Sequence, residues 1–284
     1  MSFADSVWVA AVLQRGAMLA LFVAVFLVAK AVKELATDYD IRAQLTGRDN
    51  PAVAIALAGY YLGVIIVFIG AYLGPSEGLL NDLLVVGLYS LLGILLLNVA
   101  RWTNDHFIMH TFSVRKELLE DHNAGTAAVV FASYVASGLV VAGAIHGEGG
   151  GIVTALVFFA LGQAALVIFT WVYDWIAPYS LHEEIERDNV AAGVGFAGAL
   201  IGIGLIIMDA VSGDFIGWVQ NLTVFVVDFL VVVIFLVLVR LFFDRVVLSG
   251  ADLNREIAQD RNLGAGFLEL TISIGFSAVL VLII

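Results

Sequence analysis

Long apolar runs separated by charged segments dominate the sequence. Eight runs come close to, or exceed, the roughly 20 residues that a helix needs to cross the hydrocarbon core of a membrane. Their approximate bounds are Leu13–Val32, Pro51–Gly74, Leu83–Ala100, Ala124–Ile145, Gly151–Tyr173, Val190–Val211, Leu222–Val239 and Leu263–Ile284. None shows the alternation of a membrane β-barrel strand. The pattern therefore predicts an all-α, polytopic membrane protein with eight transmembrane helices.

The even-numbered runs differ from the odd-numbered ones in side-chain size. The even runs are rich in Gly and Ala, and the sixth run carries five glycines between residues 193 and 204. Small residues let helix backbones approach closely in lipid, where no hydrophobic force drives helices together. The odd runs consist mainly of large, branched side chains. We therefore expect an inner set of even helices and an outer, lipid-facing set of odd helices.

The loops after odd runs are long and charged, whereas those after even runs are short and carry only acids. Every Lys and Arg except Arg15 lies on the long-loop side or at the helix ends that face it. Because basic residues are retained in the cytoplasm, the pattern predicts cytoplasmic long loops and, after eight crossings, both termini outside.

A short phrase recurs at the start of each even run. Its core is Asn-x-[Ala/Gly]-x-[Ala/Gly], with an Asp one or two residues before the Asn. The residues are Asp49 and Asn50, Asp121 and Asn123, Asp188 and Asn189, and Asp260 and Asn262. The first and third asparagines are 139 residues apart, as are the second and fourth. Further pairs at this offset include Arg101 with Arg240 and Asp105 with Asp244.

The offset predicts two halves of four helices each, residues 1–145 and 146–284, composed of four helical hairpins with the same orientation. We expect the halves to be parallel repeats related by a pseudo-twofold axis along the membrane normal. The repeated phrase resembles the YjfL-type family of bacterial inner-membrane proteins, also known as domain of unknown function 350. The resemblance implies an inner-membrane location and a fused pair of units that shorter members carry singly, and it supplies no activity.

The repeated phrase has two interpretations. Asp and Asn are preferred helix N-caps, so the phrase is explained by capping and by the close packing of the small residues that follow. Alternatively, four helix starts gathered near one axis would offer eight side chains to an ion or a small solute. The two interpretations do not exclude each other.

Three further features are candidates for function or structure. Glu269 lies about 10 Å into the last helix, and an acid inside the membrane indicates a functional site by default. The alternative interpretation is structural: the Glu269 carboxyl group is protonated or hydrogen-bonded to a neighbouring group. Arg101 with Asp105 and Arg240 with Asp244 are spaced by one helical turn, which predicts structural ion pairs.

Composition narrows the function classes. With 62% hydrophobic and 13% charged residues, no cysteine and a net charge of −12, the chain is neither a soluble enzyme nor a basic nucleic-acid binder. We expect no catalytic residue, metal or cofactor, and contact with membrane lipid. The first interpretation is a channel or transporter for a small ion, proton or polar solute. The alternative is a scaffold or anchor that recruits partner proteins through its long loops. Association into a homo-oligomer stays open.

Overall fold

The computed structural model describes residues 3–177, 179–242 and 255–283. These residues are helical and contain no strand. The helices are α1 (Phe3–Leu35), α2 (Pro51–Tyr72), α3 (Leu79–Thr103), α4 (Val114–Leu119), α5 (Ala124–Ile145), α6 (Ile152–Ile176), α7 (Leu181–Glu186), α8 (Val190–Val211), α9 (Trp218–Phe242) and α10 (Leu263–Ile283). Three π-helical turns accompany them: η1 (Ala43–Gly47), η2 (Asn104–Ile108) and η4 (Arg255–Gln259).

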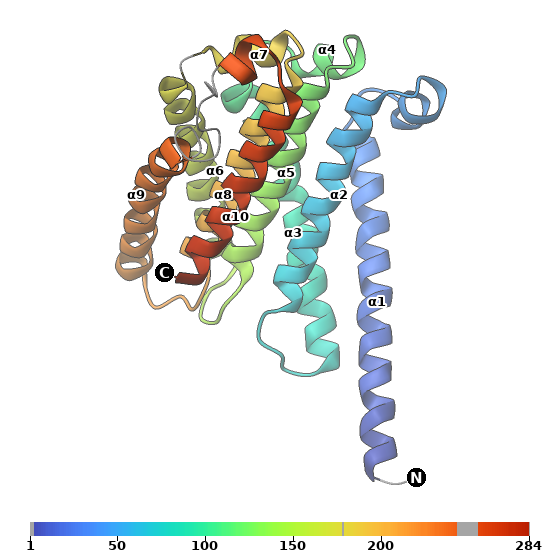
Figure 1. The fold of residues 1–284 in the computed structure, drawn as a ribbon. Coiled ribbons are helices and arrows are strands. Elements are labelled where there is room, and N and C mark those ends of the chain that lie inside the picture. The colour runs from blue at the N-terminus through green and yellow to red at the C-terminus, as the bar shows by residue number, and fades with distance from the viewer. Residues whose placement is uncertain (1–2, 178, 243–254, 284) are drawn as a thin grey trace.

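The all-α, membrane-spanning prediction is confirmed. Among the described residues, seven helices are long and apolar enough to cross a membrane, namely α1, α2, α3, α5, α6, α8 and α10. The remaining predicted run, Leu222–Val239, is the seventh in the chain and lies in α9, whose described apolar stretch is Trp218–Val231. The short loops and both ends of the described chain lie at one end of the bundle, opposite α4 and α7 (Figure 1).

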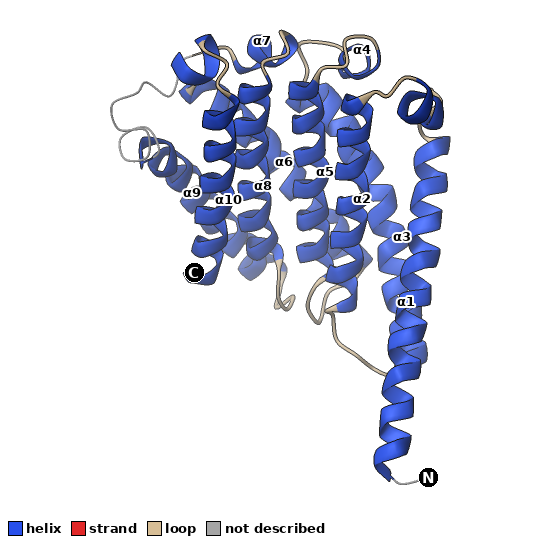
Figure 2. Ribbon diagram, turned by 45° about the vertical axis from the view of Figure 1, so that its right-hand side comes forward, coloured by secondary structure: helices blue, strands red, loops and turns tan. Residues whose placement is uncertain are grey.

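Helices α2, α5, α8 and α10 stand side by side in one row, in that order (Figure 2). Behind the row, α3 packs on α2 and α5, α6 packs on α5 and α8, and α9 packs on α8. The central helices α5 and α8 are largely buried, whereas α10 is largely exposed because it has a row neighbour on one side only. The expected inner position is therefore correct for α5 and α8 and wrong for α10.

The row corrects the expected relation between the halves. A twofold axis along the membrane normal would exchange α5 with α8, whereas the sequence repeat matches α2 with α8 and α5 with α10. A shift along the row therefore relates one half to the next, and the four helix starts do not gather around one axis. The physical reason is that α5 and α8 each pack small residues on two sides, which produces a row.

Backbones touch at every interface of the row. An added Cβ would lie 2.7 Å from Ala142 Cα if placed on Gly70 of α2, and 2.9 Å from the Ser273 carbonyl if placed on Gly202 of α8. At the interface between α5 and α8, a Cβ on Gly204 would lie 2.7 Å from Ala136 Cα. The contact that joins the two halves is therefore of the same kind as the contacts within each half, and one continuous core runs through both.

Replacement of Gly204 by valine should destabilise the fold. The larger side chain has to displace the α5 backbone, and overpacking of this kind typically costs about 1–3 kcal/mol. Gly16→Val on α1 is the matched control, because an added Cβ there has no neighbour within 4 Å. Thermal unfolding of both variants in detergent measures the difference, and equal melting temperatures would contradict the glycine-mediated contact.

Candidate functional site

Each repeated asparagine begins a helix of the row by capping it. The Oδ1 atom of Asn50 accepts hydrogen bonds from the backbone of Ala52 and Val53, and Asn123 Oδ1 accepts one from Thr126 at 2.8 Å. Asn189 and Asn262 cap α8 and α10 in the same way. The predicted capping role is therefore seen at all four helix starts, and it satisfies backbone N–H groups that lack a partner within the helix.

The amide nitrogen of the same side chain joins one repeat to the next. Asn50 Nδ2 donates to the Leu118 carbonyl at 2.8 Å, Asn123 Nδ2 to the Ile185 carbonyl at 2.7 Å, and Asn189 Nδ2 to the Ile257 carbonyl at 2.8 Å. These three asparagines are buried, whereas Asn262, in the last repeat, is exposed. Each buried asparagine thus holds the long-loop segment of the following repeat against its own helix start.

Two further hydrogen bonds, one from the backbone and one from the side chain of each asparagine, fix the turn that precedes it. The residue five or six positions earlier accepts from the Asn backbone through its carbonyl and from Asn Nδ2 through its side chain. The four acceptors are Gln44, Glu117, Glu184 and Glu256. Burial raises the pKa of Glu117 above its ordinary value, and the hydrogen bond from Asn123 offsets part of that rise.

The four aspartates do not share one role. The residue directly before each asparagine has a left-handed backbone, with φ between 48° and 54°, and it is Asp49, His122, Asp188 or Arg261. Asp188 also accepts from the backbone of Ala124 at the start of α5. In the other two repeats the aspartate lies one residue earlier and pairs with a base: Asp121 with Lys116 at 3.1 Å, and Asp260 with Arg255 at 3.5 Å.

Glu269 is buried between three helices. Its Oε1 atom accepts a hydrogen bond from the Tyr173 hydroxyl of α6 at 2.8 Å. The space for the carboxyl group exists because Gly195 of α8 has no side chain, since an added Cβ would lie 2.5 Å from Glu269 Oε2. The structure therefore places Glu269 in a contact between α6, α8 and α10, and it does not bring it together with the four asparagines.

The first half has a related polar contact that the sequence analysis missed. Lys33 Nζ of α1 donates to the Tyr134 hydroxyl of α5 at 2.6 Å and lies 5.1 Å from the centre of the Tyr60 ring. This bond and the one between Tyr173 and Glu269 both join the first helix of a half to its last helix. No sequence pattern indicates this contact, because Lys33 follows the first apolar run and is the first residue of a long charged loop.

The structure places Arg101 beside Asp105, with 2.7 Å between Nε and Oδ2. The side chain of Arg240 and all of Asp244 lie outside the described residues, so the second predicted pair is not seen.

A cavity of about 200 Å³ opens on the long-loop side, between the end of α1, the first turns of α2, the end of α3, α4 and the middle of α5. Three bases line it, and each has a partner: Lys33 with Tyr134, Arg101 with Asp105, and Arg115 with Asp38 at 2.9 Å. None of the repeated asparagines lines this cavity, and neither does Glu269.

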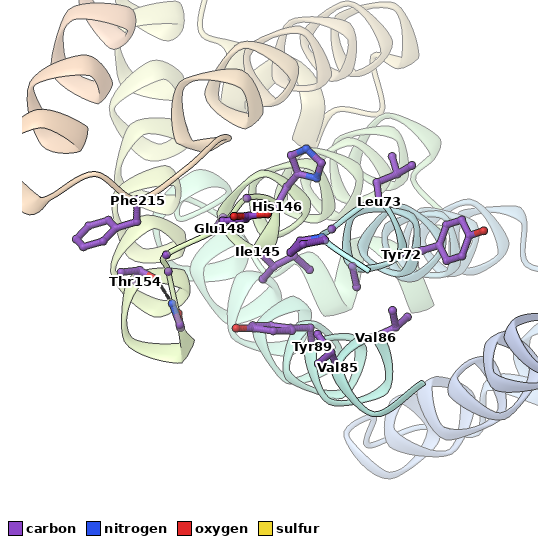
Figure 3. Close-up of a pocket in the computed structure, with 18 of the residues that line it drawn as sticks. Tyr72, Leu73, Val85, Val86, Tyr89, Ile145, His146, Glu148, Thr154 and Phe215 are labelled. Atoms are coloured by element: carbon purple, nitrogen blue, oxygen red, sulfur yellow. Dashed lines mark hydrogen bonds between the residues drawn. The ribbon is translucent and has the colours of Figure 1, made fainter. Parts of the chain in front are cut away.

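A larger cavity of about 690 Å³ opens on the short-loop side. Figure 3 shows side chains that surround it, which come from the ends of α2 and α5, from α3, from the start of α6 and from the loops that follow α5 and α8. The labelled side chains are Tyr72, Leu73, Val85, Val86, Tyr89, Ile145, His146, Glu148, Thr154 and Phe215. Its acids are Glu77, Asp82 and Glu148, and no Lys or Arg lines it. Asp82 accepts from Ser76 at 2.6 Å and from the backbone of Glu77 at 2.9 Å, so its carboxylate is already engaged in shaping the loop.

These features define a class: an α-helical polytopic membrane protein built from tandem hairpins, in which an asparagine caps the second long helix of each hairpin and, in the first three repeats, binds the next repeat. The model of the family described as Domain of Unknown Function (DUF350) matches the chain twice, over residues 7–145 and 149–284. The chain belongs to this family, as a tandem duplication of its unit.

Two relatives agree with this assignment. A UPF0719 transmembrane protein of Aquifex aeolicus (strain VF5) is 24% identical over 237 residues, which cover 80% of this chain and 86% of that protein. The UPF0719 transmembrane protein YshE of Bacillus subtilis (strain 168) is 25% identical over 127 residues, which cover 43% of this chain and 86% of that protein. No solved structure matches the chain significantly.

Replacement of Asn123 by alanine should cost more than the same change at Asn262. Asn123→Ala removes a helix cap and leaves the Ile185 carbonyl and the Glu117 carboxyl without their donor, a loss of about 2–4 kcal/mol in total. Asn262→Ala removes a cap and an exposed bond, a loss of about 1 kcal/mol. Chemical denaturation in detergent compares the two variants, and equal losses would contradict the interhelical role of the buried amide.

Replacement of Glu117 by glutamine should make the protein more stable at neutral pH, because Gln44 already fills the equivalent place in the first repeat. The raised pKa means that the folded state binds this proton more tightly than the unfolded state. The contribution of Glu117 to the unfolding free energy therefore falls as pH rises from about 4.5 through the raised pKa. Wild type and Glu117→Gln should have similar stability at pH 4 and separate toward pH 7 in thermal unfolding. The exposed Glu120→Gln is the charge-matched control, and a variant difference that does not grow with pH would refute this account.

Proposed function

We propose that this protein is a structural component of the bacterial inner membrane, a scaffold that anchors partner proteins on its long-loop side. The observation that carries the proposal is the contact of helix backbones along the row, because it leaves no room for a solute between the helices that bear the repeated motif. The buried asparagine amides also direct their hydrogen bonds to the protein itself.

The long-loop side is suited to hold a partner because its short helices are fixed to the row. Helices α4 and α7 each lead directly into an asparagine that bonds across to the next repeat or to its turn. Exposed acids lie on this surface, among them Glu120 after α4 and Glu186 at the end of α7. The positive-inside pattern predicts that this side faces the cytoplasm, and its acids suit a partner with a basic surface.

A second candidate function is a gated pathway through the first half. The observation that favours it is the presence of the two cavities at opposite ends of α2, one reaching Leu57 and the other Ala71, about 21 Å apart at 1.5 Å per residue. Between them, the buried side chains of Tyr60, Val64 and Phe68 fill the space beside α2. Conduction along this route would require those side chains to move.

Flux into proteoliposomes distinguishes the two candidates. A scaffold predicts that wild type carries no more Na⁺, K⁺, Cl⁻ or H⁺ than empty liposomes, while gramicidin gives a positive signal for cations. Tyr60→Ala removes a buried ring that contacts Tyr134, a residue that lines the long-loop cavity, and Tyr61→Ala is its matched control on the same helix. Protein-dependent flux that rises in Tyr60→Ala and not in Tyr61→Ala would overturn the scaffold and establish the pathway.

Photo-crosslinking in native membranes tests the anchoring role directly. A photoreactive residue at Glu120, on the long-loop side, should yield an adduct of one discrete mass. The same residue at Glu77, on the short-loop side, is the control and should yield none. Absence of any adduct at Glu120 would contradict the recruitment of a partner at this surface.

A further inference from the structure

The cavity on the long-loop side gathers basic residues in a chain whose net charge is −12. Its lining includes Lys33 near the end of α1, Arg101 near the end of α3 and Arg115 of α4. The acids in the lining are Asp38 and Asp105, so three bases against two acids leave a net charge of +1. The cavity on the short-loop side has the opposite character, because it has acids and no Lys or Arg. The local excess of positive charge suits an anion.

Both arginines keep hydrogen-bond donors beyond those that bind their protein partners. Among the described residues, Arg101 bonds to Asp105 through Nε alone, at 2.7 Å. Arg115 bonds to Asp38 in the same way, at 2.9 Å. The Nη atoms of each guanidinium therefore remain for another ligand. Parallel N–H donors on a planar group match the oxygens of a phosphate.

Lys33 is a charge that the fold itself does not require. Its hydrogen bond within the described part of the chain goes to the Tyr134 hydroxyl, which leaves two of the three ammonium donors free. The residues 139 positions later are Val172 and Ser273, so the second half builds the corresponding helices without this pair. An ammonium group that is half-buried is costly without a counter-ion, and an anion in the cavity would stabilise it.

Tyr39 adds a neutral donor to the lining. It lies in the loop after α1 and is half-buried. Burial raises the pKa of its hydroxyl above the ordinary value, although the positive charges of Arg101 and Arg115 act in the opposite direction. The hydroxyl therefore keeps its proton at neutral pH and is able to donate to an anion.

The position and the size of the cavity suit the headgroup of a phospholipid. Trp102, next to Arg101, is 54% exposed, and tryptophan prefers the interface between membrane and water. Farther from the long loops, Val28 of α1 and Val99 of α3 are exposed and offer apolar surface to acyl chains. A volume of about 200 Å³ holds a phosphate group of five heavy atoms, since one water needs only about 10–15 Å³.

We propose that the long-loop cavity binds a phosphate group, with Lys33, Arg101 and Arg115 as its donors. A phosphodiester carries one negative charge, which matches the net charge of the lining. Basic pockets between transmembrane helices are a known way of holding anionic headgroups, and the depth of this cavity favours a phospholipid as the source of the phosphate. Inorganic phosphate offers the same chemistry from water. The site does not depend on the proposed scaffold function.

Native mass spectrometry of the protein in detergent, with added phosphatidylglycerol, tests the site by counting bound lipid. The double variant Lys33→Gln/Arg115→Gln keeps polar side chains and loses two positive charges. Lys30→Gln/Lys116→Gln is the matched control, because both residues are exposed, lie on the same two helices and do not line the cavity. All variants are first checked for monodisperse elution and unchanged helical content.

The double variant should bind the first phosphatidylglycerol about tenfold more weakly than wild type, or weaker still, because each lost charge-assisted hydrogen bond accounts for about a factor of ten. The control should bind as wild type does. Equal binding by wild type, double variant and control would show that the lipid is held without these bases, and it would overturn a phospholipid as the ligand.

A variant with the opposite expected effect keeps the proposal testable if the double variant fails to fold. Asp38→Asn removes an exposed acid from the lining and releases Arg115, so it should strengthen phosphatidylglycerol binding. Asp40→Asn is its control, since Asp40 is equally charged and exposed but does not line the cavity. Affinity that is unchanged in Asp38→Asn, or raised as much in Asp40→Asn, would contradict the site.

Thermal unfolding in sodium phosphate, compared with sodium chloride at equal ionic strength, tests the soluble source, because a bound ligand raises the melting temperature. Lipid binding that needs the bases, with no effect of inorganic phosphate, identifies a phospholipid headgroup. A melting temperature that phosphate raises in wild type and not in Lys33→Gln/Arg115→Gln, without base-dependent lipid binding, identifies a soluble phosphate in the same cavity. Neither effect in folded protein would overturn the proposal.

Discussion

The contact of helix backbones along the row is the constraint on which the rest of the structure depends. Apolar side chains gain nothing by leaving lipid for another apolar surface, so helices in a membrane associate through close packing and hydrogen bonds. Glycines at matching places let α2, α5, α8 and α10 meet with backbone against backbone, and a side chain at Gly204 or Gly202 would collide with the neighbouring helix. Because α5 and α8 pack in this way on two sides, the successive repeats lie side by side in a row. The same closeness leaves no room between the helices for a solute.

The repeated asparagine meets a second constraint. The first backbone N–H groups of a helix lack partners within the helix and need acceptors where the helix starts. One side chain caps its own helix, closes the turn before it and, in the first three repeats, binds a carbonyl of the next repeat. An aspartate in the same place lacks the amide donors, and a serine has a single hydroxyl proton. This is why asparagine recurs at all four positions while the residue before it varies among Asp, His and Arg.

The sequence predicted the helices, their repeat and the capping role well, because apolar run length, the offset of 139 residues and helix-start chemistry are all local features. It did not predict the row, since the count of small residues in a helix does not say on how many sides they lie. The spacing between Asp and Asn already differs between odd and even repeats, and the structure adds that the backbone is left-handed at Asp49 and Asp188 and not at Asp121. The bonds from Lys33 to Tyr134 and from Tyr173 to Glu269 join distant helices through residues that break the repeat, so no pattern along the chain indicates them.

The separation of the two ends of the row tests this account most directly. Spin labels at Ile69→Cys on α2 and Val279→Cys on α10 lie at similar depth on exposed surfaces, and the chain has no cysteine of its own. A row with two intervening helices predicts an interspin distance of about 24–30 Å, from three interaxial steps of about 8–10 Å each. The measurement is made by pulsed electron paramagnetic resonance, with labelled protein diluted in unlabelled protein so that only distances within one copy are recorded. A distance below about 15 Å, as expected for four helices around one axis, would contradict the row.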